Sequence, residues 1–384
     1  MTRPIVVKNS GDSFVVKNSG GGETRQLSLD VFCREEEVRW RDLVNYAWKI
    51  LNGEIAICPF CGSMDTVKAG MRRCKYGTKQ RYFCRNCKRK FTLSTIFRIA
   101  DLPLSLVAVV VSKLARGYTA RDISKDMFEH HGVKISPPTI IRIGCRVARL
   151  LNELEILILK HFKRAFEKPM VWYIDDTFRK TRQKHSKGRR RQRVGRYFYV
   201  IAVLDEETRY CLALNVSVKR DVEAFKRTLA KALELTSGTR PAVIRSDGYA
   251  AQIEAIKALM PDVEVNSKSK DEDFSHINPI ESFFSSIRKA LCKQSRYSSI
   301  VNLQCRADLI RHRHNFLKRF SGRTPAEALG IILPSLIIED SARGFETLIK
   351  LAIALKLAEV RLDKERERER KKKQTRGLLR WMCV

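Results

Sequence analysis

Acidic residues are scarce in this chain of 384 residues. Asp and Glu number 42 against 75 Lys and Arg, which leaves a formal net charge of +33 and a pI near 10.0. Long apolar runs are missing too, because none approaches the roughly 20 residues of a membrane span. No strongly amphipathic basic anchor for a membrane surface is visible either. These absences leave a polyanion as the expected partner, with nucleic acid as the default.

A signal-peptide pattern is also absent from the N-terminus, so secretion is not expected. In such a chain the eleven cysteines are expected to be thiols or metal ligands rather than disulfides. Seven of them show no paired spacing and are interpreted as ordinary small residues: Cys33, Cys74, Cys145, Cys211, Cys292, Cys305 and Cys383.

The other four cysteines form two C-x-x-C pairs, Cys58 with Cys61 and Cys84 with Cys87, separated by the 22 residues 62–83. Two such pairs supply four thiolates, the number that a tetrahedral zinc ion binds. Basic residues crowd the stretch between and after the pairs. We therefore expect residues 55–98 to form a zinc ribbon that contacts DNA. A zinc site that only orders this segment is the alternative.

Residues 99–152 carry the start and stop signals of three helices. An apolar segment covers Leu104–Leu114, Thr119 occupies the position of an N-cap, and Ser136 caps the start of a third helix. This pattern predicts a helix-turn-helix domain whose last helix could lie in a DNA major groove. A plain three-helix bundle with solvated arginines is the alternative. The DNA-facing candidates on the last helix are Arg142, Arg146 and Arg149.

Residues 165–332 follow the pattern of an α/β domain. Three β-rich segments come first, and helices then alternate with short strands, which predicts a mixed sheet with helices on both faces. The expected strands are Val171–Phe178, Tyr197–Asp205, Tyr210–Val218, Pro241–Ile244 and Val263–Val265. The expected helices are Asp221–Leu235, one that ends at Met260, and a long one from Asn278.

Three acids occupy positions from which they could converge on one side of this sheet. Asp175 lies in the first strand, Asp247 follows the fourth strand, and Glu281 opens the long last helix. Carboxylate oxygens suit hard divalent cations, and two such ions can hold the attacking and leaving oxygens of a phosphodiester. The three acids are therefore predicted to bind catalytic metal ions.

Each acid also has a structural interpretation. Asp176 competes with Asp175, but adjacent strand residues point to opposite faces, and Asp175 has the more polar neighbours on its face. Asp247 could be a turn residue, and Glu281 could belong to a helix capping box. All three acids together, in a chain this basic, favour the catalytic interpretation.

The segment Arg179–Arg196 contains ten Lys and Arg and no acid. Because it leaves the strand of Asp175, we expect it to clamp DNA phosphates beside the active site. A basic loop without a fixed role is the alternative. The DNA-contact candidates of this region are Arg189, Arg190 and Arg191, together with Arg288 and Lys289 near Glu281 on the last helix.

The two ends of the chain have distinct compositions. Residues 1–26 are polar, contain Val-Val-Lys-Asn-Ser-Gly twice, and are expected to be a disordered tail. Residues 27–54 are predicted to form a helical lead-in. Residues 333–384 are predicted to form a helical C-terminal extension that is almost wholly charged over 361–376.

The motifs resemble those of the DDE transposases of insertion sequences, whose ribonuclease H-like catalytic fold is shared with retroviral integrases. Trp172-Tyr-Ile-Asp-Asp-Thr177 is similar to the strand of the first Asp, Arg245-Ser-Asp-Gly248 to that of the second, and Asn278-Pro-Ile-Glu281 to the Asn-x-x-Glu of the third. The 33 residues between the last two acids are similar to the family's usual spacing. The resemblance covers residues 55–332 and points to the compact bacterial and archaeal group with an upstream helix-turn-helix.

This resemblance implies a DNA transposase that binds double-stranded DNA, both at the ends of a mobile element and at the target, as a homodimer or larger assembly. A cytoplasmic, nucleoid-associated location in a prokaryotic host is implied with it. It also implies that Asp175, Asp247 and Glu281 hold two Mg²⁺ or Mn²⁺ ions, which serve to nick the element end and join its 3′-hydroxyl to target DNA. The chain departs from the group in having Asp176 where Glu is usual, a longer basic loop, and the charged C-terminal extension.

Two other functions fit parts of the pattern. A ribonuclease H-like nuclease, such as a Holliday-junction resolvase, would share the acids but would not need a zinc ribbon and a helix-turn-helix to find a specific end. A transposase-derived regulator that only binds DNA would be favoured by the loss of an acid, and all three acids are present. The sequence therefore favours the transposase.

Overall fold

The computed structural model describes residues 5–8, 13–17, 26–74, 76–93, 102–161, 170–180, 197–267, 278–292, 300–331 and 341–382. The chain divides into two compact units. Unit 1 comprises residues 1–66, 84–87 and 354–384, and unit 2 comprises residues 67–83 and 88–353. No helix of the described part is long and apolar enough to cross a membrane. The domain boundaries drawn from the sequence stay predictions.

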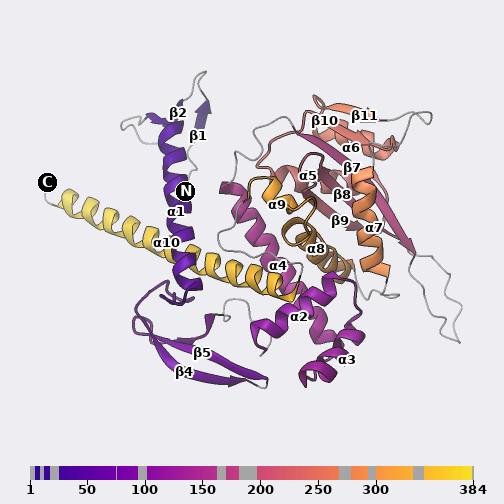
Figure 1. Ribbon diagram of the computed structural model, residues 1–384. Coiled ribbons are helices and arrows are strands. Elements are labelled where there is room, and N and C mark those ends of the chain that lie inside the picture. The colour runs from indigo at the N-terminus through magenta and orange to yellow at the C-terminus, as the bar shows by residue number, and fades with distance from the viewer. Residues whose placement is uncertain are drawn as a thin grey trace, which may run out of the picture. The chain divides into compact units, whose positions relative to one another are not determined.

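The centre of unit 2 is a five-stranded mixed sheet (Figure 1). Its strands β7, β8 and β9 form an antiparallel meander, and β10 and β11 run parallel to β7 on its other side. This order and these directions confirm the predicted ribonuclease H-like fold class. Across the sheet the strands are β11 (Glu264–Ser267), β10 (Val243–Ser246), β7 (Val171–Lys180), β8 (Tyr197–Asp205) and β9 (Cys211–Ser217).

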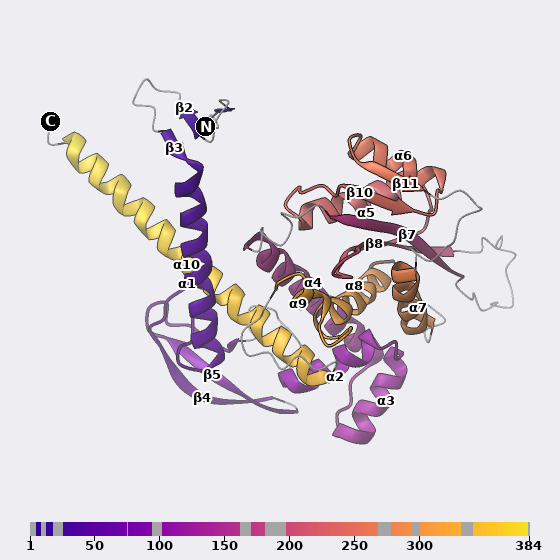
Figure 2. The same cartoon turned by 45° about the horizontal axis from the view of Figure 1, so that its top comes forward.

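Helices cover both faces of this sheet (Figure 2). The helices α5 (Val222–Leu235) and α6 (Ala250–Leu259) lie on one face, and α7 (Asn278–Cys292) and α8 (Ile300–Phe316) lie on the other. The start of α5 is fixed by Asp221, whose side chain accepts a hydrogen bond from the Ala224 N–H at 3.0 Å. On the α7 face the core contains Tyr173, Val200, Ala202 and Leu204 from the strands, and Ile280, Phe283, Phe284 and Ile287 from α7.

Three helices precede the sheet in unit 2, as the sequence predicts: α2 (Leu104–Ala115), α3 (Ala120–His131) and α4 (Pro137–His161). Thr119 forms a capping box with Asp122 at the start of α3, which confirms its role as N-cap. Gly117, with φ +94°, makes the turn between α2 and α3. A Cβ there would lie 2.5 Å from the carbonyl oxygen of Ala290 in α7, so only glycine allows this close approach.

The polar residues of α8 complete the edge of the sheet. β9 is an edge strand, and its backbone would otherwise present unpaired groups. The Val216 N–H donates to Gln304 Oε1 at 2.8 Å, and the Cys211 N–H donates to Asn315 Oδ1 at 2.9 Å. Side chains of α8 therefore replace part of a neighbouring strand.

The opposite side of α8 packs on α4 through buried polar groups. Arg311 forms an ion pair with Glu155, and His312 Nε2 donates to Asn152 Oδ1 at 2.7 Å. Glu155 also accepts from the Tyr210 hydroxyl at 2.6 Å. We call this set the α4–α8 polar seam; it consists of Asn152, Glu155, Arg311, His312 and Asn315. The seam joins the last helix of the predicted helix-turn-helix to the sheet.

Unit 1 differs from the prediction at the N-terminus. Residues 5–8 and 13–17, expected to be disordered, form the antiparallel strands β1 (Ile5–Lys8) and β2 (Ser13–Lys17), and β3 (Gln26–Ser28) pairs with β2. The two copies of the repeat pair with each other: Val6 lies opposite Val16, and Val7 lies opposite Val15. Adjacent β-branched valines favour strands, and this preference overrides the polar composition.

Two long helices contribute to unit 1. The predicted helical lead-in is α1 (Leu29–Leu51), and the C-terminal extension is α10 (Ala342–Met382), which belongs to unit 1 from Ala354 onward. Arg39 of α1 pairs with Asp363 of α10 at 3.1 Å. Arg361 of α10 donates to the Gly62 carbonyl at 3.3 Å, so the extension packs against the first cysteine pair.

The remaining short elements belong to the predicted zinc ribbon and to the end of the α/β region. β4 (Thr66–Cys74), β5 (Gly77–Cys84) and β6 (Lys90–Phe91) form a three-stranded sheet, in which Tyr82 stacks on Phe91 at 5.6 Å. α9 (Pro325–Ala328) begins with a capping box of Thr324 and Glu327.

The lowered pKa values of two histidines in α8 indicate that the folded protein loses stability at acidic pH. Burial lowers the pKa of His314 to about 4, and burial next to Arg311 lowers the pKa of His312 well below its ordinary value. The unfolded chain takes up protons on these groups below about pH 6.5, whereas the folded chain does not. The stability that they contribute is therefore present above pH 6.5 and is lost as the pH falls toward 4.

We predict that His314→Gln makes the free energy of unfolding less dependent on pH over that window. The difference in slope from the wild type should be at most about 1.4 kcal/mol per pH unit, the value for one proton. Urea unfolding at a series of pH values measures it. His131→Gln, at an exposed position in α3, is the control and should match the wild type. Equal slopes for all three proteins would contradict the prediction.

Candidate active site

The pairing of β7 with β10 brings two predicted acids near each other. The strands run parallel, with Tyr173 opposite Arg245. The pairing ends there, and Asp175 and Asp247 each follow two residues later; the charge of Asp247 acts on Asp175, so the two carboxylates are near each other. The Arg245 guanidinium lies 5.8 Å from the centre of the Tyr173 ring, so these side chains share a face. By strand alternation, Asp175 belongs to that same face.

The third predicted acid is on the helix that covers this face. Glu281 is exposed in the first turn of α7. Arg288 lies two turns further along the same flank, and its Nη1 donates to Thr177 Oγ1 at 3.3 Å. Because Thr177 is two residues beyond Asp175 on its face, this flank of α7 faces the Asp175 side of the sheet.

Asp175 and Asp247 are neighbours, but the three predicted acids do not form a closed cluster. Among the described residues, only the cysteines form a group of three or more ligand atoms within 4.8 Å of one another. Burial raises the pKa of Asp175 to about 7, and the nearby charges of Asp247 and Asp176 raise it further while the Asp176 N–H and Arg220 oppose this. A carboxylate that is this costly to ionise gains from a cation beside it. The hard oxygen donors and the raised pKa of Asp175 fit a divalent metal ion.

Asp176 lies on the other face, where a residue that the sequence analysis missed contacts it. The Asp176 carboxylate is 3% exposed and accepts from Arg220 Nε at 2.7 Å. Nη2 of the same guanidinium lies 3.4 Å from Asp247 Oδ2, and the guanidinium stacks 3.7 Å from the centre of the Tyr249 ring. Arg220 therefore bridges Asp176 and Asp247. Arg220 directly precedes Asp221, the N-cap of α5. The sequence contains 75 Lys and Arg, and no pattern in it distinguishes this arginine from the others.

We predict that Arg220→Ala destabilises the metal-free protein by about 2 kcal/mol, because the nearly buried Asp176 loses its partner. This is less than the ~3–5 kcal/mol of a fully buried pair, since Arg220 is 31% exposed. Arg220→Lys should recover only part of the loss, because an ammonium cannot reach both carboxylates as a fork. Urea unfolding without divalent metal measures the effect.

The control is Arg240→Ala, which removes the exposed ion pair of Arg240 with Asp262. It should cost less than about 1 kcal/mol. If the Arg220 and Arg240 variants lose equal stability, the bridge is not a special feature of the site.

The predicted DNA contacts fall into two groups. Arg142, Arg146 and Arg149 are all exposed on α4, and Arg288 and Lys289 are exposed on α7. Arg189, Arg190 and Arg191 lie outside the described residues. The exposed arginines of α4 recur at positions that share one stripe of the helix, as a surface that follows a DNA groove requires.

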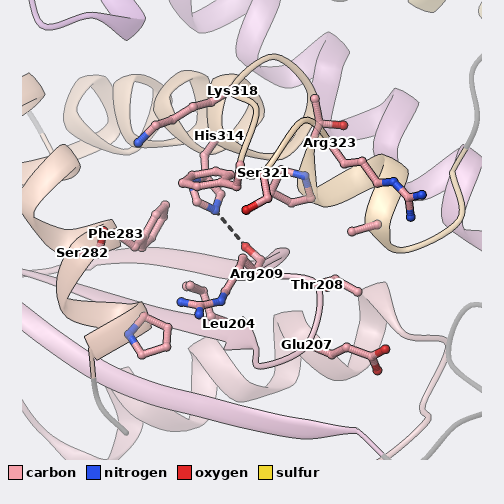
Figure 3. A pocket seen from close by; sticks show the side chains of 15 residues that line it. Leu204, Glu207, Thr208, Arg209, Ser282, Phe283, His314, Lys318, Ser321 and Arg323 are labelled. Atoms are coloured by element: carbon pink, nitrogen blue, oxygen red, sulfur yellow. Dashed lines mark hydrogen bonds between the residues drawn. The ribbon is translucent and has the colours of Figure 1, made fainter. Parts of the chain in front are cut away.

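A separate pocket of about 370 Å³ lies on the other flank of α7 (Figure 3). His314 forms part of its wall and pairs through Nε2 with the Arg209 carbonyl at 2.8 Å. Arg209, Lys318 and Arg323 line it against a single acid, Glu207, so the pocket favours anionic groups. None of the three predicted catalytic acids lines it, and we do not include it in the candidate active site.

The four paired cysteines come together within unit 1. Cys58 Sγ lies 3.5 Å from Cys87 Sγ, and Cys61 Sγ lies 3.6 Å from Cys84 Sγ. Zinc–sulfur bonds of about 2.3 Å in a tetrahedron place the sulfurs roughly 3.8 Å apart. Asn86 Nδ2 approaches Cys61 Sγ at 3.7 Å, the kind of contact that orients a metal ligand. This geometry fits a zinc ribbon that holds one zinc ion.

We predict one zinc ion per chain in freshly purified protein, and its loss in Cys84→Ser. Because structural zinc contributes to folding, the variant should unfold residues 55–98 while the α/β domain stays folded. Elemental analysis and limited proteolysis measure the two effects. Cys74→Ser, which leaves the four-cysteine group intact, should keep its zinc. Wild-type protein without zinc would contradict the assignment.

The comparison with protein families agrees with this geometry. A family model described as a DDE domain, of the IS240 transposase type, matches residues 191–319, a range that includes Asp247 and Glu281 and begins after Asp175. Over this range the chain resembles the DDE domain of insertion-sequence transposases. No curated protein matches its sequence.

Two solved structures resemble parts of the chain. The simian T-cell lymphotropic virus intasome in complex with PP2A regulatory subunit B56 gamma is 11% identical over 44% of this chain and 57% of that chain, with a TM-score of 0.29. The Mos1 transposase paired-end complex with left transposon end is 9% identical over 50% of this chain and 71% of that chain, with a TM-score of 0.19. The chain spans little more than half the length of the intasome chain. At such TM-scores neither likeness adds to the assignment.

Proposed function

We propose that this protein is a DNA transposase, which nicks the end of a mobile element and joins the freed 3′-hydroxyl to target DNA. Asp175, Asp247 and Glu281 are the catalytic acids in this proposal. The observation that supports it is the parallel pairing of β7 with β10, whose last paired residues, Tyr173 and Arg245, each stand two residues before one of these acids. The family match supports the same assignment for Asp247 and Glu281.

In this proposal the three acids hold the metal ions that the reaction needs. Two Mg²⁺ or Mn²⁺ ions, when bound, activate the attacking oxygen and stabilise the leaving 3′-oxygen. Asp175 and Asp247 offer oxygens from adjacent strands, and Glu281 offers its own from the first turn of α7. Arg220 orients the Asp247 carboxylate from behind, as a group that supports a metal ligand does.

The expected partner is double-stranded DNA, at the element ends and at the target. The net charge of +33 supports binding to phosphates, and the exposed arginines of α4 support end recognition through a helix-turn-helix. The α4–α8 polar seam fixes α4 relative to the sheet, so the bound end would be held at a set distance from the acids. A homodimer or larger assembly would bring two ends together for joining.

We predict that Asp175→Asn, Asp247→Asn and Glu281→Gln each abolish cleavage and strand transfer while binding to the element end survives. Each change keeps the side-chain size but removes a negative charge that a metal ion requires. The losses should not add, because residues that act as a unit fail together. A strand-transfer assay with the DNA that flanks the gene measures them, with Mg²⁺ or Mn²⁺ for chemistry and Ca²⁺ for binding.

Asp176→Asn is the matched control and should be far milder. It lies on the opposite face, and the amide oxygen of Asn can still accept from Arg220 Nε. An inactive Asp176→Asn beside an active Asp175→Asn would exchange the roles of the two residues. Cleavage without joining would favour the nuclease alternative, and end binding without any cleavage by the wild type would favour the regulator.

A further inference from the structure

The hairpin of β7 and β8 extends beyond the rest of the sheet. β10 pairs with β7 only over Val171–Tyr173, and the pairing of β9 with β8 ends where Ser217 lies opposite Tyr199. β7 and β8 continue to pair with each other as far as Lys180 opposite Tyr197. The last residues of the hairpin therefore form a two-stranded ribbon, which can be followed at the end of β7 in Figure 1.

This ribbon carries two exposed aromatic rings. Phe178 is 64% exposed and Tyr197 is 38% exposed, and their ring centres lie 5.9 Å apart in an edge-to-face contact. Single exposed apolar residues are normal on protein surfaces. Two touching aromatic rings at the tip of a ribbon form a preorganised surface instead, because the contact holds both rings in place.

The composition of the sequence next to the rings indicates the kind of occupant. The sequence that joins the two strands, 181–196, has eight Lys and Arg and no acid, and Arg179 and Lys180 precede it. An apolar protein surface would not need such a charge, whereas a DNA strand offers phosphates for the cations and base faces for the rings. Stacking of bases on aromatic rings beside a basic path is how proteins hold single strands.

The rings lie on the face of the sheet opposite to Asp175. Phe178 is three residues beyond Asp175 in β7, so strand alternation places it on the face of Asp176, a rise of about 10 Å further along the strand. The rings therefore form a surface separate from the proposed catalytic acids.

We propose that Phe178 and Tyr197 form a stacking site for unpaired DNA bases. The stacking does not depend on the proposed catalytic function. The site contributes through base faces and so differs from the phosphate contacts that the basic segment offers. Its preference is for DNA whose bases are unstacked, such as a single strand.

The test measures binding of full-length protein to three labelled probes by fluorescence anisotropy, without divalent metal. The probes are a 20-nucleotide oligo(dT), a 20-nucleotide abasic strand and a 20-base-pair duplex. Phe178→Ala should weaken binding to oligo(dT) by about 5- to 100-fold, the effect of losing a stacked base. Binding to the abasic strand and to the duplex should change less than twofold. The salt dependence should stay the same, because the cations that bind phosphates are unchanged.

Several variants separate stacking from other effects. Tyr197→Ala should behave like Phe178→Ala, and Phe178→Trp should restore binding to oligo(dT). Val218→Ala and Val301→Ala remove apolar side chains that are 54% and 53% exposed, and they should bind all probes like the wild type. Replacing Arg189, Arg190 and Arg191 together by Ala should weaken binding to all three probes. It should also flatten the salt dependence by about 0.7–0.9 for each phosphate that these arginines neutralise.

The proposal is overturned if Phe178→Ala binds oligo(dT) like the wild type, or if it weakens binding to the abasic strand equally. It is also overturned if the two valine controls show the same loss. Thermal unfolding of each variant confirms that the fold is intact, which is expected for exposed positions. Because the assay involves no cleavage, a failure here is distinct from a failure of the catalytic assignment.

Discussion

The ion pair between Glu155 in α4 and Arg311 in α8 fixes the position of the helix α4 relative to the sheet of unit 2. Both side chains are nearly inaccessible, at 1% and 8% exposure. An intact pair of this kind contributes little net stability, whereas the loss of one partner leaves a buried charge and costs about 3–5 kcal/mol. The pair therefore fixes geometry. Neither α4 nor α8 can slide or rotate without separating these charges.

The helix α8 also forms hydrogen bonds with β9, the edge strand of the sheet. Asn315 of α8 accepts from the Cys211 N–H and donates to both Glu155 and the Cys211 carbonyl, so a single amide joins the edge strand to the seam. Any shift of α4 is transmitted through this amide to β9, and from β9 through the ladder to β8 and β7. The helix α4 and the strand β7 are thus coupled by packing within one unit.

Much of this architecture is predictable because it rests on local patterns. The strand β8 and the helix α5 follow from alternation and from an apolar stripe, and they lie within a residue of their predicted bounds. The strand β10 was expected at Pro241–Ile244 and covers Val243–Ser246, because its pairing with two neighbours outweighs the polarity of its last residues.

The features that escaped prediction depend on partners distant in the sequence. The helix α8 has no apolar stripe, since its buried face includes Arg311, His312 and Asn315, whose partners lie in α4 and β9. Without the fold, such residues are interpreted as a solvated segment. Arg220 escaped for the same reason, because its partner Asp176 is 44 residues away. Periodicity detects burial of apolar surface, and it does not detect buried polar groups that pair with each other.

The site itself depends on the register of β7 against β10. A slip of one residue would bring Asp176 level with Asp247 and turn every side chain of the strand to the other face. One carboxylate opposes this slip: Glu206 accepts from the Tyr173 hydroxyl at 2.7 Å and pairs with Arg245 at 3.0 Å.

Tyr173 and Arg245 each stand two residues before a predicted catalytic acid, and they face each other across the two strands. Fixing this pair therefore fixes the height and the face of Asp175 relative to Asp247. Glu206 sits in the turn after β8 and takes no part in the proposed chemistry. It nevertheless specifies which of two adjacent aspartates can serve as the first acid of the site.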